Sequence, residues 1–170
     1  TPHAFGYDGF RWHVRAYCHI DHKFKDFLLP RILAVRGPGD PGSSPDQDTQ
    51  WNETFEVEIG PHPDLTPSQK AVVAKDFGMK NDRAILTVRY AMLFYVLKRL
   101  GLLGDATKQS ARAQHIVTLN RKATEEALRV TELQLCARPQ AQGPNVVMRE
   151  ARCRHRAVRR RLRVTPDRDN

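Results

Sequence analysis

Five side chains near the start of the sequence have the chemistry needed to bind a phosphate-bearing ligand. They are His13, Arg15, Tyr17, Lys25 and Arg31. The three cations can donate hydrogen bonds to phosphate oxygens, and the imidazole and phenol rings offer flat surfaces on which bases stack. Composition alone favours a different interpretation, a solvated strand face whose charges bind nothing specific. The five residues are therefore a candidate binding site for a nucleotide or a single-stranded nucleic acid. The alternative is that they form a strand surface that binds no ligand.

Other chemistries have less support. Residues 18–22 place His19 and His22 close enough to approach one ion, but zinc sites usually need four ligands and no second ligand pair follows. The sequence contains no GxSxG, P-loop or GxGxxG motif, and no Ser, His and Asp in a recognised catalytic context. We therefore expect no metal, no cofactor and no enzymatic activity.

Short antiparallel strands should position the candidate site. From residue 10 onward, apolar residues alternate with basic and aromatic ones, which predicts a strand with one apolar face and one basic, aromatic face. The apolar set is Trp12, Val14, Ala16 and Cys18, and the other set is Arg11, His13, Arg15, Tyr17 and His19. Asp8 and Gly9 predict a hairpin to a strand over 4–7. Residues 24–29 and 31–35 predict further strands, which makes three or four in all.

Residues 37–50 are predicted to be a linker. Gly, Pro and Ser are so dense over 37–45 that neither a strand ladder nor a helix should persist there. Charge also changes sign at this point, because residues 11–36 contain six bases and two acids, whereas residues 37–60 contain six acids and no base. An anion-binding surface is therefore expected on the first segment.

Residues 51–135 predict a small α/β sandwich. Strands are expected over 51–59, 83–89 and 115–119, and helices after Thr66, over 92–100 and over 124–135. Thr66, Pro67 and Gln69 form the pattern of a capping box. The side chains predicted to be buried are Phe55, Val57, Ile59, Val72, Val73, Phe77, Leu93, Val96, Leu97 and Leu100. Glu125 and Glu126 are expected in the first turn of the last helix.

The net charge of +9 is concentrated at the C-terminal end. Residues 137–170 contain ten Arg against three acidic residues, a net of +7, which leaves +2 for the first 136 residues. Apolar periodicity fails there, and we predict a disordered basic tail over 136–170. Such a tail could bind nucleic acid without discriminating sequence. The alternative, which we favour, is that it is not selected sequence, for instance an altered reading frame.

The sequence gives no sign of export or of a membrane span. No apolar run approaches the ~18 to 20 residues that cross a bilayer, and the first residues lack the basic-then-apolar order of a signal peptide. Cys18, Cys136 and Cys153 are odd in number and far apart, so they form neither a disulfide framework nor a metal clamp. We therefore expect a cytoplasmic protein.

Two parts of the sequence resemble known regulators. Residues 10–18 and 24–32 resemble the end of a WYL domain, the Sm-like β-barrel sensor of many bacterial transcriptional regulators. The Trp-Tyr-Leu tripeptide that gives the WYL domain its name is replaced here by Trp12-His13-Val14, a form typical of regulators found near phage-defence genes. Lys25 lies where the family usually has Arg. Residues 51–120 resemble the C-terminal extension of the same regulators, through 61–63, 95–102 and 115–120.

This resemblance implies an α+β chain in which partial Sm-like or SH3-like barrel strands precede the small α/β sandwich. Residues 1–36 would end the WYL domain, 37–50 would be the linker, 51–135 the dimerisation extension and 136–170 the tail. It also implies a homodimeric regulator that senses a nucleotide or single-stranded nucleic acid effector. Such a regulator would contact DNA through a winged-helix domain preceding Thr1. Activation or repression stays open, as does a protein-interaction module without its own ligand.

Overall fold

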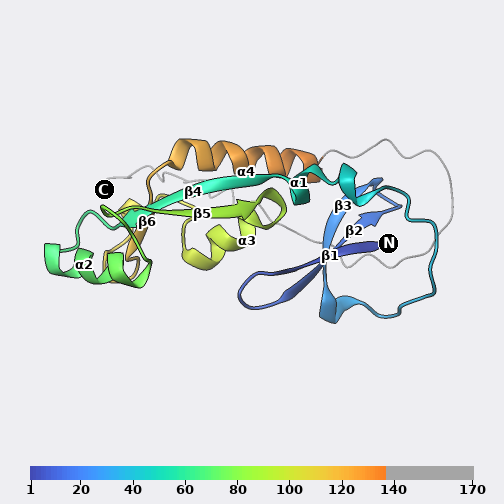
Figure 1. Cartoon of the computed structure of the whole chain (residues 1–170), viewed down its shortest axis with the longest axis horizontal. Coiled ribbons are helices and arrows are strands. Elements are labelled where there is room, and N and C mark those ends of the chain that lie inside the picture. The colour runs from blue at the N-terminus through green and yellow to red at the C-terminus, as the bar shows by residue number, and fades with distance from the viewer. Residues whose placement is uncertain (137–170) are drawn as a thin grey trace, which may run out of the picture. The chain divides into compact units, whose positions relative to one another are not determined.

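The computed structural model describes residues 1–136, and the segment predicted to be a disordered tail lies outside the described residues from 137 onward. The described residues form two three-stranded antiparallel sheets and four α-helices (Figure 1). The α+β prediction is confirmed. Both sheets are open, and the described strands do not close a barrel.

The first sheet contains β1 (Pro2–Tyr7), β2 (Trp12–Cys18) and β3 (Lys23–Leu28), with β2 in the centre. The predicted hairpin joins β1 to β2. Its turn is held by the Asp8 carboxylate, which accepts hydrogen bonds from the backbone N–H groups of Phe10 and Arg11 at 2.8 and 2.6 Å. Gly9 adopts a φ of 87°, a left-handed conformation that glycine tolerates without steric cost.

The strand predicted over 31–35 is wrong. Leu29–Arg31 forms a single 3-10 turn with Pro30 in its first positions, and no strand follows it over 32–36. Pro30 lacks an N–H and favours the start of a helical turn, so the chain leaves the sheet edge here. Leu33 and Val35 are consequently 99% and 88% exposed.

The predicted linker ends in ordered structure. A 3-10 turn, Pro45–Gln47, leads into α1 (Thr49–Asn52). The strand predicted from residue 51 therefore starts later, because Asp48 begins a helical turn that includes Trp51. The Asp48 carbonyl oxygen accepts hydrogen bonds from the N–H groups of Trp51 and Asn52 at 3.0 and 2.9 Å.

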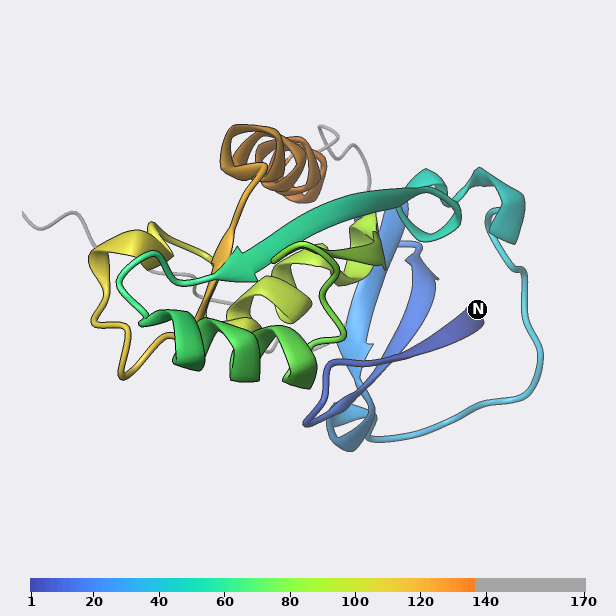
Figure 2. The same ribbon diagram turned by 60° about the vertical axis from the view of Figure 1, so that its left-hand side comes forward.

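The second sheet has β4 (Thr54–Pro61) between β5 (Ala84–Arg89) and β6 (Ile116–Thr118). The predicted alternation is confirmed, since Val57 and Ile59 are fully buried while Glu56 is exposed. α4 (Arg121–Cys136) runs alongside β4 in both ribbon views (Figure 2).

α2 (Pro67–Asp76) joins β4 to β5 and begins with the predicted capping box. Its burial differs from the prediction, because Val73 is buried whereas Val72 and Phe77 are 60% and 40% exposed. Neighbouring helical residues point about 100° apart, so Val72 cannot share the narrow buried face of Val73. Phe77 lies at the C-cap, beyond the last helical residue.

α3 (Tyr90–Leu100) carries the most apolar face, with Leu93 and Leu97 fully buried. A 3-10 turn, Ala106–Lys108, lies between α3 and β6. α4 starts at residue 121 instead of 124, so Glu125 and Glu126 lie in its second turn. α3 contacts α4, and both contribute to one apolar cluster with β4. No helix in the described part of the chain is long and apolar enough to cross a membrane.

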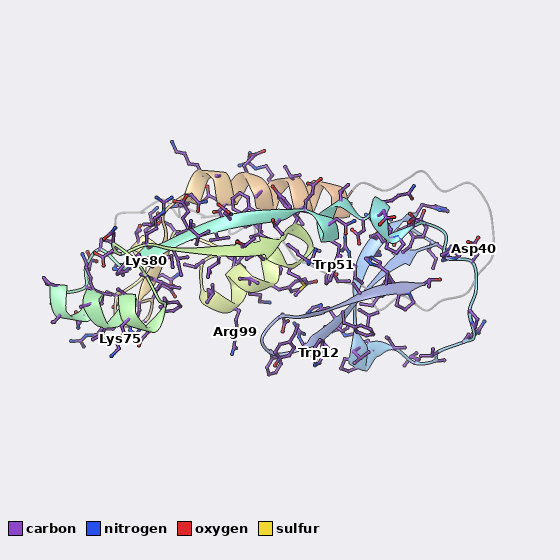
Figure 3. The ribbon with its side chains drawn as sticks, viewed as in Figure 1. Trp12, Asp40, Trp51, Lys75, Lys80 and Arg99 are labelled. Atoms are coloured by element: carbon purple, nitrogen blue, oxygen red, sulfur yellow. The ribbon has the colours of Figure 1, made fainter. Side chains whose placement is uncertain are left out.

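The first sheet contacts α3 at several points. The sulfur of Met92 lies 2.7 Å from the position that a Cβ on Gly6 would occupy. The His13 ring packs against that of Tyr95, tilted by 48° with centroids 4.3 Å apart. Arg99 extends from α3 to the β1–β2 turn, where its side chain contacts Gly9 (Figure 3).

Leu97→Ala should destabilise the fold by about 2 to 5 kcal/mol, because it removes a fully buried side chain and leaves a cavity in the core. Leu33→Ala is the matched control, since the same change at a 99% exposed position should alter the free energy of unfolding by less than about 0.5 kcal/mol. Urea denaturation of both variants measures this. Equal effects would contradict the assignment of Leu97 to the core.

Candidate functional site

Arg15 of β2 is the centre of a buried polar cluster. Its side chain is 1% exposed, and its Nε and Nη2 atoms donate to Asp48 Oδ2 and Oδ1 at 2.7 and 2.8 Å. Nη2 also donates to Gln50 Oε1 at 3.0 Å, and Nη1 donates to Asp26 Oδ2 at 3.3 Å. The two bonds to Asp48 are the bidentate arrangement in which a guanidinium binds a carboxylate most strongly.

The Asp48 carboxylate joins three parts of the chain. Besides Arg15, its Oδ2 contacts Nε2 of His3 in β1 at 2.9 Å, and its Oδ1 accepts from the N–H of Trp51 in α1 at 3.3 Å. The β1–β2 register shifts between Pro2 and Ala4, the stretch that contains His3. One side chain from the end of the linker therefore fixes β1, β2 and the start of α1 together.

The two carboxylates around Arg15 have different electrostatics. Burial alone would raise the pKa of Asp48, but the hydrogen bonds and charge of Arg15 outweigh it, so the pKa is lowered. At Asp26, burial is the stronger effect, and its pKa is raised despite the nearby guanidinium. Asp26 Oδ1 accepts no hydrogen bond from the described residues. Asp48 is therefore the principal counter-ion of Arg15, and its ionised form is favoured.

A cavity of about 400 Å³, wide open to solvent, adjoins this cluster. Its lining residues are Arg15, Tyr17, His22, Lys23, Phe24, Ser43, Gln47, Asp48, Thr49 and Gln50. The rings of Tyr17 and Phe24 lie on one wall, edge to face with centroids 5.3 Å apart. Cavities of ~300 to 1,000 Å³ are typical of small-molecule sites. The cavity thus combines a guanidinium, a carboxylate and two aromatic rings.

The structure brings together two of the five predicted site residues, Arg15 and Tyr17. Lys25 pairs with Ala16 in the β2–β3 register, so its side chain projects from the opposite face of the sheet to Arg15, and it forms an ion pair with Asp21. Arg31 lies in the exposed 3-10 turn after β3. The basic face of β2 is also more buried than predicted, since Arg15 is 1% exposed whereas Trp12 on the apolar face is 51% exposed.

His13, the fifth residue, is 2% exposed and does not line the cavity. Its Nε2 contacts Asp8 Oδ2 at 3.0 Å, and its ring packs on Tyr95. Burial alone would raise the pKa of Asp8, but the His13 hydrogen bond and the N–H groups of Arg11 and Phe10 lower it to about 2. Here His13 fixes the β1–β2 turn.

Sequence reasoning missed Asp48, Asp26 and His3. The signal for Asp48 was present, because it lies in the acidic stretch that follows the basic segment and directly precedes a helical turn, the position at which Asp commonly caps a helix. No group of three or more His, Cys, Asp or Glu that could hold a metal ion occurs in the described residues.

Asp8→Asn should lower stability at neutral pH and lose its effect in acid. Because the folded-state pKa of Asp8 is lowered to about 2, the ionised carboxylate stabilises the fold above its ordinary value of 3.8, and this contribution is lost as the pH falls through about 2. The free energies of unfolding of wild type and Asp8→Asn should differ by on the order of 1 to 2 kcal/mol at pH 6 and should become equal near pH 2. Urea denaturation across this range, with carboxyl NMR of Asp8, tests this, and a constant difference contradicts it.

Comparisons with known proteins agree with this architecture. Residues 54–124 match the family described as the BrxR transcriptional regulator, C-terminal dimerization domain. A relative from Stenotrophomonas maltophilia, named DNA-binding transcriptional repressor CapW, is 40% identical over 134 residues, which cover 76% of this chain and 44% of the relative. A relative of the same name from Pseudomonas aeruginosa is 37% identical over 75% of this chain and 43% of its own length. Another from Escherichia coli strain KTE188 is 32% identical over 71% of this chain and 40% of its own length.

The chain thus spans less than half the length of the curated relatives it matches. The family match falls on the second sheet and its helices, and the alignments with the relatives are longer than that match. The resemblance found in the sequence is confirmed: the chain is similar to DNA-binding transcriptional repressors and to the C-terminal dimerization domain of the BrxR regulator, which agrees with the C-terminal region of a WYL-type regulator.

Proposed function

We propose that this chain is the effector-sensing and dimerisation part of a cytoplasmic transcriptional repressor, and that its cavity binds a nucleotide or a single-stranded nucleic acid. The observation that carries the proposal is the cavity itself. Arg15, Tyr17 and Phe24 all line it. A guanidinium binds phosphate oxygens and aromatic rings stack on bases, so the wall has both contacts that such ligands use.

Repression and DNA binding are proposed from the relatives, which are named DNA-binding transcriptional repressors. Since those proteins are more than twice the aligned length, a winged-helix DNA-binding domain is proposed for sequence outside this chain. Effector binding would shift a dimer between forms that bind DNA well and poorly. A role beside phage-defence genes follows from the same resemblance, and no step of this function requires catalysis.

We further propose that β1, β2 and β3 belong to an Sm-like barrel, with residues 1–36 ending the WYL domain and 37–50 linking it to the extension over 51–135. An apolar surface on the first sheet supports this. Phe5, Tyr7, Trp12 and Phe27 are between 38% and 60% exposed. The β-ladder places these four side chains on one face, where further strands could cover them.

A second candidate is a protein-interaction module without its own ligand. It is favoured by one observation, that donors of Arg15 already bind Asp48, Asp26 and Gln50. In that case the Arg15 cluster only stabilises the fold, and no titration would reveal a ligand for the cavity.

Titration with a 5′-phosphorylated thymidine tetranucleotide separates the two candidates. Wild-type protein should bind it saturably, and affinity should fall with salt because phosphate contacts release counterions. Arg15→Gln and Tyr17→Ala should each weaken binding by about tenfold or more, corresponding to the loss of one charge-assisted bond or one stacked base.

Variants at His13, Lys25 and Arg31 test whether the site extends beyond the cavity, which stays a prediction. Lys25→Gln is the informative comparison, because it removes a positive charge from the other face of the same sheet. Equal losses for Arg15→Gln and Lys25→Gln would contradict a site confined to the cavity. Absence of saturable binding would favour the interaction module.

The dimer is tested by sedimentation equilibrium of the full chain. We expect a mass about twice the 19.5 kDa of one chain at micromolar concentration, because residues 54–124 match a dimerization domain. A mass of one chain throughout this range would contradict the proposed homodimer.

A further inference from the structure

We propose that the Asp48 carboxylate occupies the position on Arg15 that the anionic group of the effector takes, so that effector binding displaces Asp48 and releases α1. This inference rests on the proposed function, because it assigns the regulation of the same cavity. It treats Asp48 as an internal competitor of the ligand, supplied by the linker.

The geometry of the pair supports competition. Asp48 meets the Nε and Nη2 edge of Arg15 with two oxygens, at 2.7 and 2.8 Å. A phosphate group presents two oxygens to the same edge in the same planar manner. Both residues line the same cavity as Tyr17 and Phe24.

Asp48 and a bound anion cannot share the site at low energetic cost. The Asp48 side chain is 2% exposed, and its charge is compensated chiefly by Arg15. If a phosphate takes the guanidinium edge, the carboxylate becomes a buried charge beside another negative charge. His3 also contacts Asp48, at 2.9 Å, but it offers a single hydrogen bond in place of the bidentate pair. The favourable response is for Asp48 to move away.

Movement of the Asp48 side chain removes the side-chain cap of α1. The N–H groups of Trp51 and Asn52 bond to the Asp48 carbonyl oxygen, and that of Trp51 also bonds to its carboxylate. α1 has four residues, too few to persist without tertiary support.

Three further contacts join α1 and the residue after it to α4, β5 and α3. Gln50 Nε2 donates to the carbonyl oxygen of Thr131 in α4 at 3.5 Å. The Arg89 guanidinium, at the end of β5, lies over the Trp51 ring at 5.0 Å. The residue after α1, Glu53, accepts a backbone bond from Tyr90 of α3 at 3.2 Å. Release of α1 would therefore reach the region that matches the dimerization domain.

The first test uses inorganic phosphate and needs no knowledge of the effector. Asp48→Asn keeps the side-chain shape and the capping capacity but removes the competing charge, so phosphate should bind about tenfold more tightly than to wild type. Adding Arg15→Gln should abolish the gain, which places the bound ion on Arg15. Asp26→Asn is the matched control, because Asp26 approaches Arg15 through Nη1 alone. This variant should change the affinity for phosphate by less than about threefold. Circular dichroism checks that each variant is folded.

The second test uses wild-type sequence around the site, so it does not depend on a variant at Asp48. In Trp12→Phe protein, Trp51 is the one remaining tryptophan of the two in the chain. Saturation with the phosphorylated tetranucleotide should change Trp51 fluorescence and speed amide exchange at Trp51 and Asn52.

The outcomes separate this inference from the proposed function. In one outcome, oligonucleotide binding requires Arg15, but amide exchange at Trp51 and Asn52 is unchanged and Asp48→Asn does not increase the affinity for phosphate. That outcome supports the proposed function and overturns the displacement of Asp48. A phosphate gain in Asp48→Asn without oligonucleotide binding by wild type supports the competition and overturns the nucleic-acid effector. Equal phosphate affinity in Asp48→Asn and wild type overturns the inference in either case.

Discussion

The buried positive charge of Arg15 is the constraint on which much of the described structure depends. A guanidinium does not lose its proton in a protein, so a side chain that is 1% exposed must be met by carboxylates. The principal one, Asp48, lies 33 residues further along the chain. The chain after β3 must therefore return to β2, and the place of its return determines where α1 and β4 begin.

The return of the chain to β2 at Asp48 also explains how the two small sheets, which share no strand, are held together. Trp51 lies on α1 between them, with His3 of β1 edge-on to its ring at 6.2 Å and Arg89 of β5 over it. Met92 and Tyr95 of α3 complete the contact against Gly6 and His13. Each sheet of three strands is near the smallest size with independent stability, so these contacts support both.

Local patterns predicted most elements, and long-range contacts explain the differences. The alternation around Val57 and Ile59 and the capping box at Thr66 depend on neighbouring residues, so the sequence alone was sufficient for them. The burial of Arg15 depends on a partner from another segment. The opposite charges of residues 11–36 and 37–60 are compatible with such a partner, but Asp40, Asp46 and Asp48 fit that pattern equally well. Tertiary packing alone decides that Asp48 is the partner and that Lys25 faces away.

The exposed stretch before Asp48 has a consequence for protein engineering. Within residues 1–136, no heavy atom beyond the chain neighbours lies within 4 Å of the position of a Cβ on Gly37 or Gly39, and residues 31–42 are all exposed. Doubling the length of such a loop costs only about 0.6 kcal/mol in closure entropy. An epitope or a small reporter domain can therefore be inserted between Gly37 and Gly39 without strain on either sheet, whereas the few residues between Asp48 and β4 have no such tolerance.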